Sequence, residues 1–258
     1  MPSNKIIWLC MALFFTTAPH ALQADAPRCP PAQRLSDFDA GGGAARGFSS
    51  DVKQRGSIDM TVDPERAANG VVTFRASKKS GKQVGKAHLV YRFDPVGIGS
   101  TVTMAARVYF PSQSAVNSVT LMDLECANCG LDTNPGVRLY LRDGLLRVDR
   151  SKIGIQPAFL PSANVPVTKA TWHQITWVVR LGDSETGSAA GLAQVYLDNA
   201  LVLDSTGITI LTQAAVDRVG GGGLQVQSLV DRFQIGLTAN SNKSETTMLV
   251  DDVSFCIQ

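Results

Sequence analysis

The sequence predicts an all-β protein built as a sandwich of two antiparallel β-sheets. Apolar and polar residues alternate along most of the chain, which is typical of strands with one buried face. Turn signals such as Arg142-Asp143-Gly144 and Asp198-Asn199 separate these stretches. About a dozen short strands joined by tight turns favour two packed sheets.

The N-terminal residues have the pattern of a secretory signal peptide. Lys5 precedes an unbroken apolar run, Ile6–Phe15, and small residues follow up to Ala24. The run is too short for a membrane span, which needs roughly 20 residues. We expect cleavage after Ala24, with Ala21 as the alternative. The prediction is therefore a signal peptide over 1–24, one β-sandwich domain over 25–258, no transmembrane anchor after cleavage, and a secreted or periplasmic location.

The charge of the chain is close to neutral, with 24 Lys and Arg against 22 Asp and Glu. This balance argues against a nucleic-acid partner, because binding phosphates normally needs a basic face. The lysines of 78–86 form one basic stretch punctuated by glycine and serine. It could attract an anionic polysaccharide or be a solvated hairpin loop.

Strands are expected wherever the alternation is regular. Val102, Met104 and Ala106 alternate with more polar neighbours, as do Ile175, Trp177 and Val179. The expected strands are 102–110, 121–125, 137–142, 174–181, 193–198, 201–204, 232–238 and 247–255. A short helix is expected over 211–219.

Three segments near the C-terminus carry a resemblance to a known fold. They are Trp172-His173-Gln174-Ile175-Thr176-Trp177, Val195–Val202 and Val250-Asp251-Asp252-Val253-Ser254-Phe255. Together they resemble the end of a laminin G-like or polysaccharide lyase-like jelly roll of the concanavalin A-like lectin/glucanase superfamily. The resemblance implies a two-sheet jelly roll in which His173 belongs to a structural strand-start motif. These motifs support a fold, and a fold does not decide a function.

Four cysteines lie in 25–258, an even number that predicts two disulfides in an exported chain and allows three connectivities. We favour Cys29–Cys256, because this bridge would tie both ends of a sandwich whose first and last strands are neighbours. Cys126 and Cys129 would then pair locally, with a zinc site as the weaker alternative.

One face of the central strands collects residues suited to binding a glycan. If Met122, Leu124 and Leu139 face the core, the opposite face carries polar and aromatic side chains. In the resembling folds this is the concave, glycan-binding face. The candidate ligand-binding residues are Arg107, Tyr109, Asp123, Glu125, Arg138, Tyr140 and Arg142. Such residues hydrogen-bond hydroxyls, stack on sugar rings and pair with uronates. A solvated face with cross-strand ion pairs is the alternative.

Leu121-Met122-Asp123-Leu124-Glu125 also resembles the catalytic strand of the laminarinase and lichenase family, Glu-x-Asp-x-Glu. Leu121 stands where that family has its nucleophile. Because retaining hydrolysis needs two carboxylates flanking the scissile bond, this reaction should fail here.

Three functions follow as hypotheses. The leading one is an exported, non-catalytic glycan-binding or envelope-associated domain with a polysaccharide partner and no required cofactor. The second is a polysaccharide lyase acting on a uronic acid-containing polymer by β-elimination. Tyr140, Arg138 and His88 are its candidate catalytic residues: Tyr or His suits the base, and Arg suits the group that neutralises the carboxylate. The Gln-Ile-His and Tyr-Phe-Lys-Ala-Gly motifs of alginate lyases are absent. The third is a structural or adhesion module that binds protein.

The resemblance also implies a structural calcium where the first and last strands meet. Asp251 is the matching position on the last strand, and Asp37 or Asp39 could contribute from the first. Calcium takes six to eight oxygen ligands, so carbonyls and water would complete the shell. Alternatively, Asp251 only caps a strand end.

Overall fold

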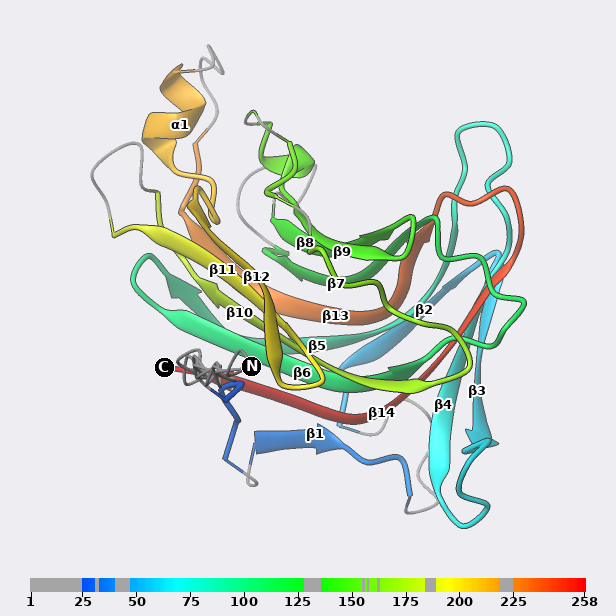
Figure 1. The fold of residues 1–258 in the computed structure, drawn as a ribbon. Coiled ribbons are helices and arrows are strands. Elements are labelled where there is room, and N and C mark those ends of the chain that lie inside the picture. The colour runs from blue at the N-terminus through cyan, green and yellow to red at the C-terminus, as the bar shows by residue number, and fades with distance from the viewer. Residues whose placement is uncertain are drawn as a thin grey trace, which may run out of the picture.

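A computed structural model describes residues 25–30, 33–39, 47–127, 136–154, 156, 158–161, 163–183, 189–218 and 225–258. The predicted all-β sandwich is confirmed: two antiparallel sheets pack face to face (Figure 1). Period-two alternation favours this arrangement, because it gives a strand one apolar face that can pack in the core.

The larger sheet has eight strands, and the last strand of the chain lies inside it. Its order is β12-β11-β10-β6-β14-β4-β3, with β1 also paired to β14. The bounds are β1 Arg34–Ser36, β3 Gly56–Val62, β4 Gly70–Ala76, β6 Thr101–Tyr109, β10 Trp172–Arg180, β11 Gly191–Leu197, β12 Ala200–Gly207 and β14 Thr246–Ile257.

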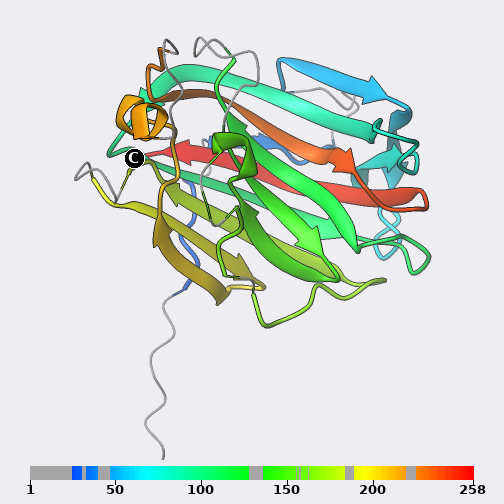
Figure 2. The same ribbon diagram turned by 90° about the horizontal axis from the view of Figure 1, so that it is seen from above.

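The smaller sheet has six strands in the order β2-β5-β13-β7-β8-β9. Figure 2 shows β13, in orange, between β5 and the green strands. The bounds are β2 Ser50–Gln54, β5 Gly85–Gly97, β7 Ser118–Glu125, β8 Val137–Arg142, β9 Leu145–Asp149 and β13 Leu229–Asn240. The short 3-10 helix η2, Ser151–Ile153, follows β9, and the helix α1, Gln213–Arg218, lies within the predicted helical segment.

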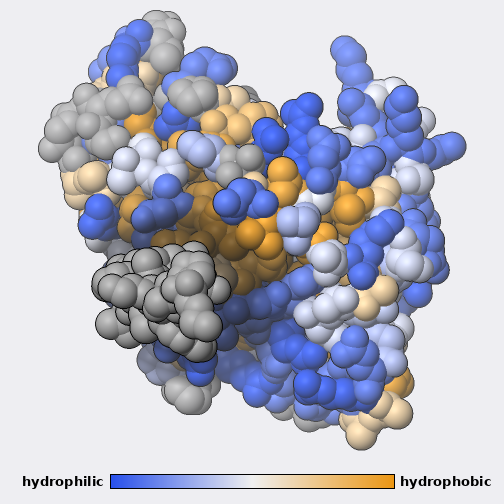
Figure 3. Space-filling view, in the orientation of Figure 1, coloured by the Kyte–Doolittle hydropathy of each residue, from blue (hydrophilic) through white to orange (hydrophobic). Residues whose placement is uncertain are grey.

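Aromatic side chains from both sheets meet in the core. Phe255 of β14 lies 4.7 Å from Phe93 of β5 and 5.7 Å from Phe233 of β13, measured between ring centroids. Trp177 of β10 is fully buried nearby in the same core cluster. Figure 3 shows the hydrophobic surface gathered in the middle of its view, with hydrophilic residues around it. Burial of such large side chains is the main favourable contribution to folding.

The predicted Cys29–Cys256 disulfide is present, with 5.6 Å between the two Cα atoms. The first and last strands are also neighbours, as this prediction requires, because β1 pairs with β14 through Arg34 and Ser254. The predicted Cys126–Cys129 bridge involves Cys129, which lies outside the described residues, as does the predicted signal peptide. In the described part of the chain, no helix is long and apolar enough to cross a membrane.

We predict that the Cys29→Ser/Cys256→Ser variant loses roughly 2–5 kcal/mol of its free energy of unfolding. The bridge spans 227 residues, so it restricts the unfolded chain strongly. Urea denaturation of the variant and the wild type, both without reductant, measures the loss. Equal midpoints and slopes would contradict the prediction.

Candidate functional site

A cavity of about 500 Å³ opens on the outer face of the six-stranded sheet. The alternation of β13 explains it: Phe233, Ile235 and Leu237 enter the core, and the residues between them face outward. The lining residues come from five strands, η2 and the neighbouring loops. They are Val52, Val84, Lys86, His88, Asp123, Glu125, Arg138, Lys152, Arg232, Gln234, Thr238, Ala239 and Ser241.

Glu125 is the most highly coordinated side chain of the cavity. It is 2% exposed, and its Oε1 accepts a hydrogen bond from Lys152 Nζ. Its Oε2 accepts from Arg232 Nη2 at 2.7 Å and from Gln234 Nε2 at 2.9 Å. Because three donors, two of them cationic, surround one buried carboxylate, its negative charge is well compensated.

Arg138 lies on β8 directly across from Asp123 of β7. Its guanidinium forms an ion pair with Asp149 and donates to Ser151 Oγ at 2.9 Å. Asp149 also accepts from the Ser151 backbone N–H at 2.7 Å. These contacts hold Arg138 at the rim between β8, β9 and η2.

His88 is a buried, uncharged histidine in the wall of the cavity. It is 4% exposed, and its Nδ1 has no hydrogen-bond partner among the described residues. Burial lowers its pKa to about 3, and the charges of Lys86, Arg232 and Lys152 act in the same direction. At neutral pH the imidazole is therefore neutral, with a free ring nitrogen.

Gly236 makes room for this histidine on the adjacent strand. It pairs with His88 across β5 and β13 and has a φ of +133°. A Cβ at this position would lie 2.7 Å from His88 Cα, closer than real side chains approach. Only glycine therefore fits here without moving His88.

Asp123 has surroundings unlike those of Glu125. It is 4% exposed, and its Oδ1 has no hydrogen-bond partner in the described structure. Burial raises its pKa to about 7, with a further increase from the charge of Glu125, while Lys152, Arg138 and Thr238 act in the opposite direction. Near neutral pH the Asp123 carboxyl is thus partly protonated.

Four of the residues singled out in the sequence meet at this cavity: His88, Asp123, Glu125 and Arg138. Tyr140 lies on the same sheet outside the described cavity lining, with its hydroxyl hydrogen-bonded to that of Ser118. Arg142 is exposed at the end of β8 and forms a 3.8 Å ion pair with Asp143.

Two of the expected ligand-binding residues lie elsewhere. Arg107 and Tyr109 are on β6, in the eight-stranded sheet, so they do not share a face with the other candidates. Arg107 lies over the Trp172 ring, 4.6 Å from its centroid. Alternation shows which residues of a strand avoid the core. It does not show to which of two sheets the strand belongs, which explains the error.

Leu121 also differs from its expected position. The pairing of β7 with β8 is irregular between Thr120 and Met122, and Leu121 and Met122 are both buried in the core cluster. Leu121 therefore does not continue the outward face of Asp123 and Glu125. The similarity to Glu-x-Asp-x-Glu is one of sequence alone.

Five polar lining residues are not among the candidates from the sequence: Lys152, Arg232, Gln234, Thr238 and Ser241. Lys86, expected in a basic loop, lies in β5. The alternation of the predicted strand 232–238 could have revealed Arg232 and Gln234. Lys152 lies in a three-residue 3-10 helix, which has no periodic signal. The structural role expected of His173 fits its contacts, because its ring bonds Asp198 at 2.7 Å and Thr168 Oγ1 at 2.8 Å.

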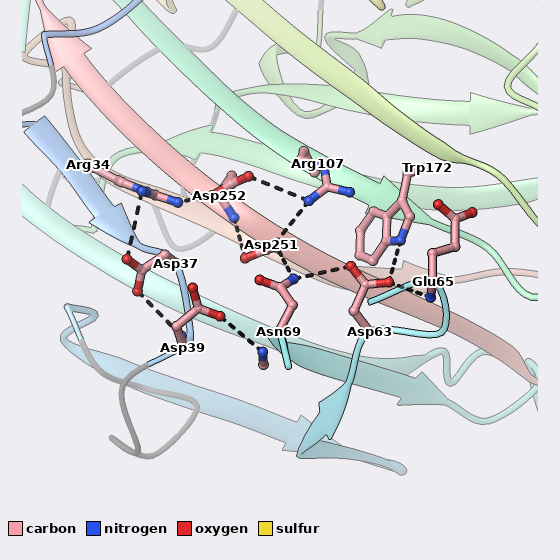
Figure 4. Close-up of polar contacts among 11 residues, drawn as sticks. Arg34, Asp37, Asp39, Asp63, Glu65, Asn69, Arg107, Trp172, Asp251 and Asp252 are labelled. Carbon is pink, nitrogen blue, oxygen red and sulfur yellow. Dashed lines mark hydrogen bonds and ion pairs between the residues drawn. The ribbon is translucent and has the colours of Figure 1, made fainter. Parts of the chain in front are cut away.

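The three expected calcium ligands, Asp251, Asp37 and Asp39, approach one another beside β14 (Figure 4). Asp251 Oδ2, however, accepts from Asn69 at 3.0 Å and from Arg107 at 3.2 Å, and Asp37 pairs with Arg34. The described residues contain no group of three acidic, His or Cys side chains placed to hold a metal. As arranged, these side chains do not fit calcium, since donors occupy the carboxylates. Calcium binding stays a prediction from the sequence.

No protein-family model and no curated protein match the sequence. Solved structures match the fold. An endo-β-1,4-glucuronan lyase from the fungus Trichoderma reesei is 13% identical, covers 83% of this chain and 92% of its own, and has a TM-score of 0.59. The cellulose-induced protein Cip1 is 14% identical, with 86% and 95% coverage and a TM-score of 0.57. The alginate lyase Aly36B is 13% identical, with 86% and 96% coverage and a TM-score of 0.55.

These similarities confirm the predicted two-sheet jelly-roll fold, and at this identity they show the fold alone. They also correct one expectation. We expected a non-catalytic glycan-binding domain, but two of these three structures, matched over most of their length, are named as lyases.

We predict that His88→Gln makes the protein less sensitive to acid. The unfolded chain protonates His88 near pH 6.5 and the folded protein only near about pH 3, so acidification through this range favours unfolding of the wild type. The melting temperature of the variant should fall by several degrees less than that of the wild type between neutral pH and about pH 4. Asp123 titrates in both proteins, so the comparison isolates His88. Parallel pH profiles would contradict a buried neutral histidine.

The calcium prediction is tested by thermal melting with calcium or with a chelator. If calcium binds at Asp251, it raises the melting temperature of the wild type and leaves Asp251→Ala unchanged, because ligands that bind only the folded state stabilise it. Equal melting temperatures of the wild type in both conditions would reject the site.

Proposed function

We propose that the protein is a polysaccharide lyase that cleaves a uronic acid-containing polymer by β-elimination after export from the cell. One observation supports this most: a neutral, buried His88 with a free ring nitrogen lines a cavity rich in cations. Four described lining residues are cationic, Lys86, Arg138, Lys152 and Arg232, against two carboxyl groups. The fold shared with glucuronan and alginate lyases supports the same class, and a disulfide near the chain ends fits an exported protein.

β-Elimination on a uronate requires three chemical events at the site. A base removes the proton from carbon 5 of the uronate, beside the carboxylate. Negative charge then builds up on the carboxylate and needs positive groups or hydrogen-bond donors. The oxygen at carbon 4 leaves with its electron pair and takes up a proton, which yields a double bond between carbons 4 and 5.

His88 is proposed as the base. A histidine with a pKa near 3 is a weak base in the free protein. A bound uronate brings a negative charge next to the ring, and this charge raises the pKa toward a useful value. The unpartnered Nδ1 offers a lone pair or a proton without breaking an existing hydrogen bond.

The cations of the cavity are proposed to receive the carboxylate. Arg138 is held at the rim by Asp149, and Arg232 and Lys152 are held by Glu125. These partners fix the cations in place before substrate arrives, which lowers the cost of reorganisation.

The leaving oxygen at carbon 4 is proposed to take its proton from the protonated His88, which has removed the proton from carbon 5 of the same sugar ring. This transfer returns His88 to its neutral form, so the reaction leaves no net change of protonation on the protein. Thr120 of β7 pairs with Tyr140 on one side and with Ala239, a cavity residue, on the other. Tyr140 is on the same strand as the cavity residue Arg138, but β8 is three strands from β5, which carries His88, so roughly 14 Å separates these two strands. Tyr140 is therefore too far from His88 to act on the same sugar ring, and it can contact a neighbouring sugar of a polymer that lies across the sheet.

The test is the release of unsaturated uronate ends, followed by their ultraviolet absorbance. We expect the purified protein to act on at least one of glucuronan, alginate and polygalacturonate, and not on a neutral β-glucan. His88→Gln should lower the rate by about 10²–10⁴-fold. Arg75→Ala, an exposed ion-pair residue on β4, is the control and should match the wild type.

Two results would count against the proposal. Absence of unsaturated ends with every polyuronate would reject the lyase function. Full activity in His88→Gln would retain the function and reject His88 as the base.

A further inference from the structure

Asp123 is a buried carboxyl group of the cavity that the proposed reaction has not used. It lies between Gln234 of β13 and Arg138 of β8, its cross-strand neighbours. It lines the cavity, yet its Oδ1 has no hydrogen-bond partner among the described residues. A buried carboxylate oxygen without a donor is costly, so burial favours the protonated form.

Thr238 hydrogen-bonds the Asp123 carboxyl and favours its ionised form, whereas the described hydrogen bonds of the other nearby donors go to other groups. Lys152, Arg232 and Gln234 donate to Glu125. Arg138 donates to Asp149 and Ser151. Asp123 is therefore close to positive charge without being directly paired by it, and it lies beside the negative charge of Glu125.

Charged groups face Asp123 from every neighbouring element. These are Glu125 on β7, Arg138 on β8, Lys152 on η2, Arg232 on β13, and Lys86 and His88 on β5. The cations favour the ionised form, while burial and Glu125 oppose it, and the balance leaves the pKa of Asp123 at about 7.

We propose that Asp123 binds substrate as a neutral carboxylic acid and donates a hydrogen bond to the carboxylate of the bound uronate. The inference rests on the proposed lyase function and adds a substrate-binding residue to it. A carboxyl–carboxylate hydrogen bond is charge-assisted and short. It places a donor where negative charge builds up during the elimination.

This proposal predicts that binding takes up a proton. A bound carboxylate next to Asp123 favours the protonated form of Asp123 still more. Above about pH 7, where Asp123 is mainly ionised in the free protein, it therefore gains a proton on binding. Below that pH the proton is already present. Proton uptake by His88 would depend on pH in the opposite way. Its pKa is about 3 in the free protein, so the number of protons that His88 takes up on binding falls as the pH rises.

Titration calorimetry in buffers of different ionisation enthalpy counts the protons. We would use tetrasaccharides of glucuronate, galacturonate and alginate uronates with the His88→Gln variant, which should slow cleavage and which removes the histidine titration. At about pH 8 we expect uptake approaching one proton, and at about pH 6 markedly less.

Two further substitutions, made in the same His88→Gln background, separate the proton from the side chain. Asp123→Asn keeps a hydrogen-bond donor, so it should bind within a few-fold and take up no proton at either pH. Asp123→Ala should bind about tenfold more weakly at both pH values, since it loses the hydrogen bond.

The outcomes distinguish this inference from the function it rests on. If no tetrasaccharide binds and no polyuronate is cleaved by the wild type, the lyase function fails and the inference fails with it. If a tetrasaccharide binds without proton uptake at about pH 8, or if Asp123→Asn keeps the uptake, the function stands and the role of Asp123 is wrong.

Discussion

The buried carboxylate of Glu125 organises the cavity. It receives hydrogen bonds from side chains of β13 and η2, so it joins the middle of the six-stranded sheet to the segment after β9. Leaving such a group without its partners typically costs 3–5 kcal/mol, which makes the arrangement hard to vary. Its effect on the neighbours is equally important. Glu125 engages the local donors, and this leaves Asp123 with an unpaired oxygen and the cavity with a fixed set of cations.

The two other ionisable groups of the cavity are uncharged for opposite reasons. His88 loses its proton because burial and nearby cations disfavour an imidazolium, whereas Asp123 keeps its proton because burial and a nearby anion disfavour a carboxylate. Between about pH 3 and about pH 7 both are mainly neutral in the free protein. A site with fixed cations and neutral proton-exchanging groups is suited to an anionic ligand, because the charges that attract the ligand are not those that move protons.

The sequence predicts the fold well and the site in part. Alternation is local, so it locates strands such as β6 and β10 and identifies their outward residues. Sheet membership is set by contacts between residues far apart in the chain, so alternation does not predict that Arg107 lies on the eight-stranded sheet. The irregularity at Leu121 arises from pairing with β8 and has no sequence signal. The pairing of Cys29 with Cys256 was predictable, since neighbouring first and last strands bring the chain ends together. The contact of Lys152 with Glu125 was not predictable, because only the tertiary fold brings η2 close to Glu125.

The Cys29–Cys256 bridge has a mechanical consequence. The bridge joins two cysteines that are 227 residues apart in the sequence, so one covalent ring contains nearly all of both sheets. Tension applied to the chain before Cys29 and after Cys256 passes through the sulfur–sulfur bond and bypasses the strands. The sandwich inside the ring bears almost none of this load, so its hydrogen-bonded ladders and the cavity on β5, β13 and β7 keep their shape while the ends are pulled.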